Sequence, residues 1–203
     1  MLNKKKLIIF DLDGVLINSL PNMEYSWNMV RKKYNLPIQF SQYKKFIGLP
    51  FYIILNKLNI NKNKKKIFND YNYYSKKKIS KIKFYKNTKK VLRQLKKNYY
   101  LAIYTSKNRE RTHIILSSLK SIFDIVITPA EVKKGKPHPE GINKIKKIFN
   151  VQNKNIYFLG DSIFDKIAAQ KARVNFLFAC WGYGKIKGKS KKLIRIEQIF
   201  SYL

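Results

Sequence analysis

Five short apolar segments constrain this fold more than any other feature of the sequence. They are rich in β-branched and aromatic residues, which is the pattern of strands buried on both faces. The segments span residues 7–10, 101–105, 125–128, 156–159 and 175–179. Segments with helical periodicity precede the second strand and separate the later ones, at residues 88–97, 109–120, 139–149 and 162–172. Strands that alternate with helices predict an α/β fold, with a parallel sheet covered by helices on both faces.

The stretch between residues 17 and 82 breaks this alternation. It predicts four helices, at residues 22–34, 41–46, 50–58 and 62–80, with Gly48 and Pro50 punctuating the middle. The stretch is too long for a loop, since loops without structure of their own rarely exceed about 15 residues. The sequence therefore predicts a core of residues 1–16 and 83–203, and an inserted α-helical domain of residues 17–82.

The charge of the chain is strongly unbalanced. There are 44 Lys and Arg residues against 11 Asp and Glu, which gives a formal net charge of +33. Such a surplus suits a nucleic-acid-binding protein, because Lys and Arg release counterions from phosphate backbones. However, the basic residues are spread over the whole chain, and Lys, Asn and Ile, whose codons are rich in A and T, make up about two fifths of it. We therefore interpret the charge as a property of overall composition and expect no specific nucleic-acid partner.

The composition also excludes several protein classes. With 45% hydrophobic and 14% aromatic residues, the chain is not a disordered polycation. Its single cysteine excludes a disulfide framework and suits a reducing compartment. No apolar run is long enough to span a membrane, and Asp11 follows the first apolar residues too soon for a signal peptide. We expect a cytoplasmic protein without membrane attachment.

The scarce carboxylates are concentrated at the ends of predicted strands. Asp11 and Asp13 follow the first strand directly and stand just before Gly14, where the chain can turn. Two carboxylates this close raise each other's pKa unless a cation lies between them, and Mg²⁺ favours such oxygen ligands. The alternative is an ordinary turn, which Asp and Gly also favour.

A second pair of carboxylates follows the fourth predicted strand. Asp161 lies near the start of the next predicted helix, where free N–H groups favour a carboxylate, so a helix N-cap at Asp161 or Ser162 would account for it. Asp165 lies one turn further on, on the helix face that we expect Asp161 to share, and like charges at that spacing are unfavourable. A nearby cation is again the economical explanation.

Three further polar residues follow strand ends. Thr105 and Ser106 end the second strand, where hydroxyl and N–H groups can hold a phosphate oxygen or simply cap the next helix. Lys136 follows the third strand, between Gly135 and Pro137, which fix the loop that carries it. Ligands of a doubly wound sheet bind beyond the carboxyl ends of its strands. We therefore expect all these side chains to meet at one edge of the sheet.

These motifs, in this order and spacing, resemble those of the haloacid dehalogenase superfamily of phosphohydrolases. The matching segments are residues 11–16, 105–106, 135–137 and 160–165. The inserted helices resemble the helical cap of the branch that contains phosphoglycolate phosphatase and β-phosphoglucomutase. The resemblance implies a Rossmann-like, doubly wound core with the first strand at its centre, covered by a helical cap.

The resemblance also implies roles for individual residues. Asp11 would be the nucleophile that forms an aspartyl-phosphate, and Asp13 the general acid and base. Thr105 and Ser106 would hold phosphoryl oxygens, and Lys136 would offset charge in the transition state. The Mg²⁺ site would be formed by Asp11, the backbone carbonyl of Asp13 and Asp161, with Asp165 as a ligand through water or as a residue that orients the ligands.

Other positions bear on substrate and subfamily. Residues 46–50 resemble the cap loop that reaches the site, which makes Gly48 a substrate-binding candidate and implies that the cap sets substrate choice. Related dehalogenases lack an acid at the position of Asp13, because halide leaves without a proton, so that Asp13 favours phosphoryl chemistry. Asn18 and Arg173 depart from the pattern, since relatives often carry Asp and Gly there.

The leading hypothesis is a Mg²⁺-dependent phosphatase that hydrolyses a small phosphomonoester, such as phosphoglycolate or a sugar phosphate. A phosphosugar mutase of the β-phosphoglucomutase type is the alternative with the same site, and it differs in how the cap excludes water. A nucleic-acid-binding protein built on this core is a third alternative, motivated by the net charge of +33.

Overall fold

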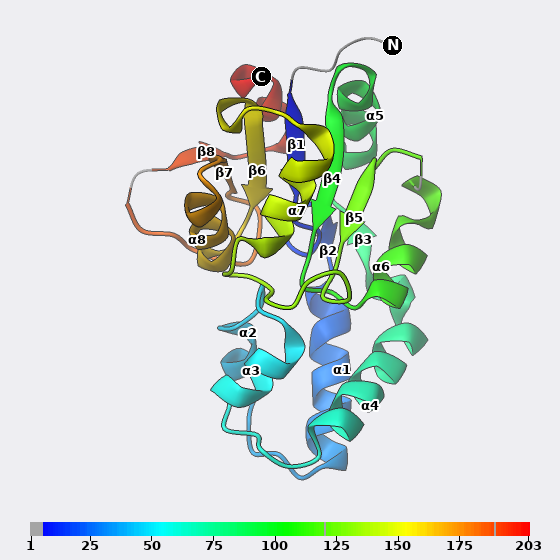
Figure 1. Ribbon diagram of the computed structural model, residues 1–203. Coiled ribbons are helices and arrows are strands. Elements are labelled where there is room, and N and C mark those ends of the chain that lie inside the picture. The colour runs from blue at the N-terminus through cyan, green and yellow to red at the C-terminus, as the bar shows by residue number, and fades with distance from the viewer. Residues whose placement is uncertain (1–5, 120, 189) are drawn as a thin grey trace.

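A six-stranded parallel sheet lies at the centre of the protein, in the order β5–β4–β1–β6–β7–β8 (Figure 1). The computed structural model describes residues 6–119, 121–188 and 190–203. The strands are β1 (Leu7–Phe10), β4 (Tyr100–Tyr104), β5 (Ile125–Ile127), β6 (Ile156–Gly160), β7 (Asn175–Ala179) and β8 (Lys191–Leu193). The first strand is central, with β4 on one side and β6 on the other. The predicted α/β fold with a Rossmann-like, doubly wound sheet is confirmed.

Successive side chains of β1 enter two separate cores, one on each face of the sheet. Ile8 and Phe10 pack in the first core, and Leu7 and Ile9 pack in the second. Because side chains alternate along a strand, a strand that is covered on both faces must be apolar throughout. The helices that cover the first core are α5 (Thr88–Asn98), α6 (Arg109–Leu116), η2 (Ser117–Leu119) and η4 (Ile196–Tyr202). Those that cover the second are α7 (Glu140–Phe149) and α8 (Ile163–Ala172).

The helices of the inserted segment form a third core at one end of the molecule (Figure 1). We call them the helical layer: α1 (Leu20–Lys33), α2 (Phe40–Lys44), α3 (Phe51–Lys57), α4 (Lys64–Lys77) and η1 (Ile79–Lys81). Trp27, Tyr43 and Tyr71 are almost fully buried in this core, and the rings of Trp27 and Tyr43 stack with centroids 4.6 Å apart. The helical layer is therefore stabilised by an aromatic core of its own, distinct from the two cores of the sheet.

The helical layer leaves and rejoins the core at a single place. Two short strands, β2 (Ile17–Asn18) and β3 (Lys83–Phe84), pair antiparallel there, with Ile17 opposite Phe84. The boundaries that we predict for the inserted domain lie at these two strands, while the division into two folding units stays a prediction.

Several elements differ from the sequence-based expectation. Strands β2, β3 and β8 were not expected, and the helix expected at 109–120 ends at Leu116 and continues as η2. Lys120, the last residue of that expected helix, lies outside the described residues. Arg173 ends α8 with a φ of 56°, so that it adopts the left-handed conformation that glycine would take more easily.

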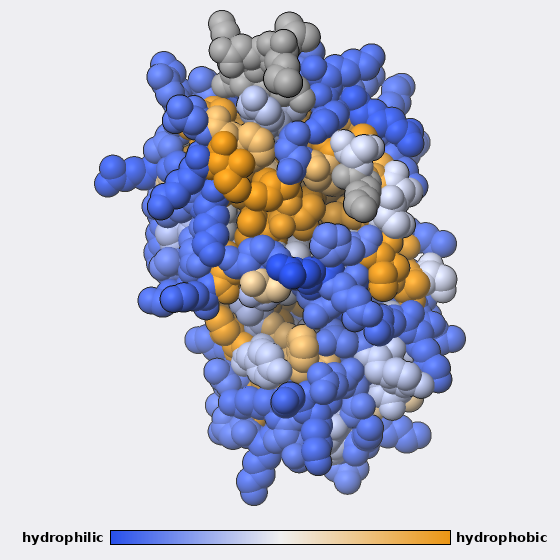
Figure 2. All heavy atoms as spheres, turned by 45° about the vertical axis from the view of Figure 1, so that its right-hand side comes forward, coloured by the Kyte–Doolittle hydropathy of each residue, from blue (hydrophilic) through white to orange (hydrophobic). Residues whose placement is uncertain are grey.

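Hydrophilic side chains cover most of the face shown in Figure 2, and apolar side chains gather over the half of the molecule that contains the sheet. Within the described ranges, none of the helices combines the length and the hydropathy that crossing a membrane would require.

Candidate active site

The carboxyl ends of β1, β4 and β6 lie side by side, because these strands are neighbours in the sheet. Asp11 follows β1, Thr105 follows β4 and Asp161 follows β6. The loop after β5 contributes Lys136, and the loop after β7 contributes Tyr183. The core motifs are thus brought to the edge at which doubly wound sheets bind ligands.

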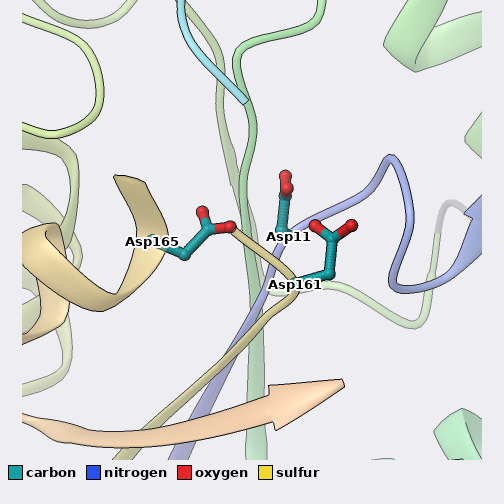
Figure 3. A group of neighbouring side chains, drawn as sticks. All are labelled: Asp11, Asp161 and Asp165. Atoms are coloured by element: carbon teal, nitrogen blue, oxygen red, sulfur yellow. The ribbon is translucent and has the colours of Figure 1, made fainter. Parts of the chain in front are cut away.

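Three buried carboxylates face one another at this edge (Figure 3). Asp11, Asp161 and Asp165 each offer an oxygen atom, and these three atoms lie within 4.8 Å of one another. Burial raises the pKa of Asp11 to about 7; Lys136 opposes this rise and Asp165 adds to it. Burial, followed by the charges of Asp165 and Asp11, raises the pKa of Asp161 well above its usual range. A cluster that resists full ionisation in this way fits a divalent cation with oxygen ligands.

The backbone around Asp161 fixes its carboxylate. The N–H of Tyr183 donates a hydrogen bond to its Oδ2, with an N–O distance of 2.6 Å. A Cβ atom on Gly14 would lie 2.1 Å from the same oxygen, and the φ of Gly14, +82°, is one that other residues rarely adopt. The turn predicted at Gly14 therefore also leaves room for Asp161.

Lys136 is completely buried and bridges two of the clustered carboxylates. Its Nζ lies 2.8 Å from Oδ1 of Asp11 and 2.7 Å from Oδ1 of Asp165. Burial alone would lower the pKa of Lys136, but Asp11 and Asp165 outweigh burial and raise this pKa above the usual value of lysine. The ammonium group therefore stays charged and ties Asp11 to the start of α8.

Asp165 has a second role that we did not expect. Ser162 is the N-cap of α8, and Asp165 is the third residue of the helix. The N–H of Asp165 donates to Oγ of Ser162 at 3.2 Å, and the N–H of Ser162 donates to Oδ2 of Asp165 at 3.1 Å, which is a capping box. Asp161 precedes the helix, so the expectation that it shares a helix face with Asp165 was wrong. The Ser-x-x-Asp pattern of residues 162–165 was the available signal.

The side chain of Asp13 contacts different partners from the three clustered carboxylates. Its Oδ1 accepts a hydrogen bond from the hydroxyl of Ser19 and lies 3.0 Å from Nζ of the buried Lys107. Lys107 was not predicted, because 44 basic residues make any one lysine a weak signal. Its position directly after Thr105 and Ser106 was the signal that could have found it.

Tyr183 connects Asp161, Asp13 and the point where the helical layer begins. Its hydroxyl accepts a hydrogen bond from the N–H of Ser19 at 2.6 Å and donates one to the carbonyl of Ile17 at 3.1 Å. Ser19 in turn donates to Asp13. Tyr183 was also not predicted, although it follows the last predicted strand, whose carboxyl end lies at the site.

The predicted phosphate-binding hydroxyls already have partners within the protein. Oγ1 of Thr105 accepts from the N–H of Lys107 at 3.1 Å, and Oγ of Ser106 donates to the carbonyl of Gly48 at 2.7 Å. The φ of Gly48 is +105°, and a Cβ atom there would lie 2.9 Å from Oγ of Ser162. Gly48 is thus a close contact between the helical layer and two loops of the core.

A cavity of about 40 Å³ lies between the helical layer and the ends of the strands. It is far smaller than the roughly 300–1,000 Å³ of pockets that hold drug-sized ligands. A ligand that enters this cavity must therefore be small. Its walls are formed by Asp11, Asp13, Met23, Tyr43, Ile47, Gly48, Leu49, Phe51, Ile54, Tyr71, Thr105, Ser106, Lys107 and Arg111.

The sequence matches the family of haloacid dehalogenase-like hydrolases over residues 8–179. It is 28% identical over 194 residues to a phosphoglycolate phosphatase of Haemophilus influenzae, with 88% of this chain and 87% of that protein covered. It is 26% identical over 179 residues to the pyrophosphatase PpaX of Oceanobacillus iheyensis, with 87% of this chain and 84% of that protein covered.

Solved structures share the fold over nearly the full chain. A candidate phosphoglycolate phosphatase from Lactobacillus plantarum is 23% identical and superposes with a TM-score of 0.90, covering 98% of this chain and 100% of its own. A predicted phosphoglycolate phosphatase from Haemophilus somnus is 25% identical, with a TM-score of 0.83 and coverage of 98% and 97%.

Proposed function

Since the chain belongs to the haloacid dehalogenase-like hydrolase family, we propose that it is a Mg²⁺-dependent phosphatase that hydrolyses a small phosphomonoester through an aspartyl-phosphate intermediate. The observation that carries the proposal is a buried carboxylate, Asp11, held by Lys136, with a second acid, Asp13, beside the same cavity. Relatives named phosphoglycolate phosphatase and pyrophosphatase support phosphoryl chemistry over dehalogenation.

Asp11 is the proposed nucleophile. The N–H of Leu12 donates to its Oδ1 at 2.7 Å, and Nζ of Lys136 lies 2.8 Å from the same oxygen. Because both contacts fall on Oδ1, we assign Oδ2 as the atom that attacks phosphorus while the bond from phosphorus to the leaving oxygen breaks. Lys136 offsets negative charge during this transfer.

Asp13 is the proposed general acid and base. It gives its proton to the leaving oxygen, and it later accepts a proton from the water molecule that attacks the aspartyl-phosphate. That attack releases inorganic phosphate and restores the carboxylate of Asp11. Contacts from Lys107 and Ser19 to Oδ1 of Asp13 hold the carboxyl group in place for both transfers.

The metal ion would be held by Asp11, Asp161 and Asp165, with the backbone carbonyl of Asp13 as a further ligand. Bound there, Mg²⁺ would neutralise charge on the phosphoryl group and orient it. Thr105 and Ser106 are the proposed partners of the remaining phosphoryl oxygens, and Gly48 of the helical layer closes over them.

The test is release of inorganic phosphate from a panel of small phosphomonoesters, with Mg²⁺ and after treatment with EDTA. We expect hydrolysis that depends on Mg²⁺, and we expect Asp11→Asn to lower kcat by at least about 10³-fold. Glu24→Gln, which changes an exposed acid of α1, is the matched control and should retain activity. A folded protein that hydrolyses no member of the panel would contradict the proposal.

Product analysis distinguishes hydrolysis from the mutase reaction. A phosphosugar mutase returns the phosphoryl group to the sugar and converts a hexose 1-phosphate to the 6-phosphate. We expect free hexose and inorganic phosphate instead, and formation of the 6-phosphate would favour the mutase.

A further inference from the structure

Arg111 is a core residue that reaches the cavity beneath the helical layer. It lies on α6, it is 6% exposed, and it lines the same cavity as Asp11 and Asp13. Its Nη1 donates a hydrogen bond to Oγ of Ser75 at 2.8 Å, and its guanidinium lies 5.3 Å from the ring centroid of Tyr71. Two residues of α4 thus hold the guanidinium in place at the wall of the cavity.

The charge of Arg111 is not balanced by a carboxylate in the part of the chain that the structure describes. No Asp or Glu there lies within ion-pair distance of it, and its buried Nε atom has no hydrogen-bond partner. The other two buried cations of the site are paired, Lys107 with Asp13, and Lys136 with Asp11 and Asp165. A buried charge without a counterion is costly, so an anion bound beside Arg111 would be stabilised.

A second cation adds to the positive charge at this end of the cavity. Lys107 is 4% exposed, stands four residues before Arg111 and lines the same cavity. Two like charges at one buried cavity wall repel each other. An anion at the cavity wall would relieve this repulsion as well as the unpaired charge of Arg111.

We propose that Arg111 binds a second anionic group of the substrate, a carboxylate or a phosphate, that is joined by a short linker to the phosphoryl group transferred to Asp11. Because Arg111 lines the same small cavity as Asp11 and Asp13, the two anionic groups have to lie close together, which favours a short linker. This inference rests on the proposed phosphatase function. It also places one determinant of substrate choice in the core, whereas the sequence led us to expect it in the cap alone.

The test compares substrates that differ in the charge of the second group. The kcat/KM is measured with phosphoglycolate, which carries a carboxylate, with pyrophosphate, which carries a second phosphate, and with ethyl phosphate, which carries neither. We expect the wild-type protein to prefer one of the two anionic substrates over ethyl phosphate. We call the kcat/KM of the preferred anionic substrate divided by that of ethyl phosphate the preference ratio. In Arg111→Met the preference ratio should fall roughly 10- to 100-fold, because hydrogen bonds to a charged group are lost. Most of the fall should come from a higher KM for the anionic substrate.

Matched variants separate substrate binding from a structural effect. Arg111→Lys should retain part of the preference because it keeps the charge. Arg109→Met changes an exposed arginine of the same helix and should keep the wild-type ratio. A ratio that is unchanged in Arg111→Met, or a wild-type protein without a preference, would overturn the inference while leaving the phosphatase function intact.

Calorimetric titration tests the same site without turnover. In the background of Asp11→Asn, Arg111→Met should weaken the binding of phosphoglycolate or pyrophosphate at least about 10-fold, and that of ethyl phosphate much less. If binding shifts in this way but no variant hydrolyses any substrate, the proposed function fails and the anion site stands. Equal dissociation constants with and without Arg111 would contradict the site.

Discussion

Lys136 balances two carboxylates with one ammonium group, so its removal should affect stability as well as activity. In Lys136→Met, Asp11 and Asp165 would lose a counterion that lies 2.8 and 2.7 Å away. Breaking a buried ion pair from one side costs about 3–5 kcal/mol. We expect urea titrations in EDTA to show a free energy of unfolding at least about 3 kcal/mol lower than that of the wild type.

The exposed Lys134 of the same loop provides the control for this loss. Lys134→Met should change the free energy of unfolding by no more than about 0.5 kcal/mol, as surface substitutions usually do. Equal stabilities of the two variants would show that the ion pairs of Lys136 contribute nothing.

Tyr183 acts on the proposed chemistry through Ser19 and is a positioning residue. Tyr183→Phe removes the hydroxyl that accepts from Ser19 and donates to Ile17, and Ser19 then holds Asp13 less firmly. We expect kcat to fall about 5- to 10-fold, the equivalent of one hydrogen bond, with KM changed less than kcat. Tyr73→Phe, at a half-exposed tyrosine of α4, is the control. A rise in KM at constant kcat would contradict a positioning role.

At the scale of elements, Glu140 at the start of α7 holds the loop that carries Lys136. Its carboxylate accepts hydrogen bonds from the N–H groups of Lys133 at 3.0 Å and Lys134 at 2.9 Å. These two hydrogen bonds lower the pKa of Glu140 from 4.5 to about 2, and Lys144 adds to the effect. Because the pKa is depressed in the folded state, the stabilisation is complete above about pH 4.5 and is lost as the pH falls through about 2.

The prediction concerns the difference in melting temperature between the wild type and Glu140→Gln. We expect Glu140→Gln to melt at the lower temperature near neutral pH, and the gap to narrow as the pH falls below about 4.5. Thermal unfolding followed by circular dichroism from about pH 3 to pH 7 measures it. A gap that is the same at every pH would show that the carboxylate charge is unimportant.

The elements that could be predicted are those whose burial shows directly in the sequence. β1 and β7 have the predicted bounds, because β1 is a continuous apolar run between a lysine and an aspartate, and β7 places the apolar run of residues 176–179 directly after Asn175. β8 escaped prediction because Lys191 and Lys192 are exposed and only Leu193 is buried. β2 and β3 have two residues each, which is too short for any periodic pattern.

The residues of the candidate site also divide into those that the sequence pattern reveals and those that it does not. Side chains at the carboxyl ends of predicted strands, such as Asp11 and Asp161, were expected there because parallel strands share one carboxyl edge. Arg111 could not be found in this way, because its environment is created by Ser75 and Tyr71 of α4. The helices α4 and α6 are far apart in the sequence and meet only in the folded protein. Contacts between the core and the helical layer have no local signature in the sequence.

At the scale of the whole molecule, the charge of +33 should attract polyanions through the general field of the surface. We expect fluorescence anisotropy to detect weak binding of duplex DNA at low salt and to show that this binding is lost by about 150 mM NaCl, where charges more than about 8 Å apart are screened. The same measurement with single-stranded DNA should give a similar salt dependence. Tight binding at physiological salt would favour the nucleic-acid-binding alternative.

Ile17 and Phe84 stand opposite each other in one antiparallel pair, so the chain departs from the core and returns to it across a gap that a tight turn could span. A segment attached in this way can be lengthened, shortened or exchanged without moving any strand of the central sheet. The helical layer and the sheet can then have separate evolutionary histories. The helical layer can diverge by insertion or recombination at this one junction, while the strand-end residues keep their register.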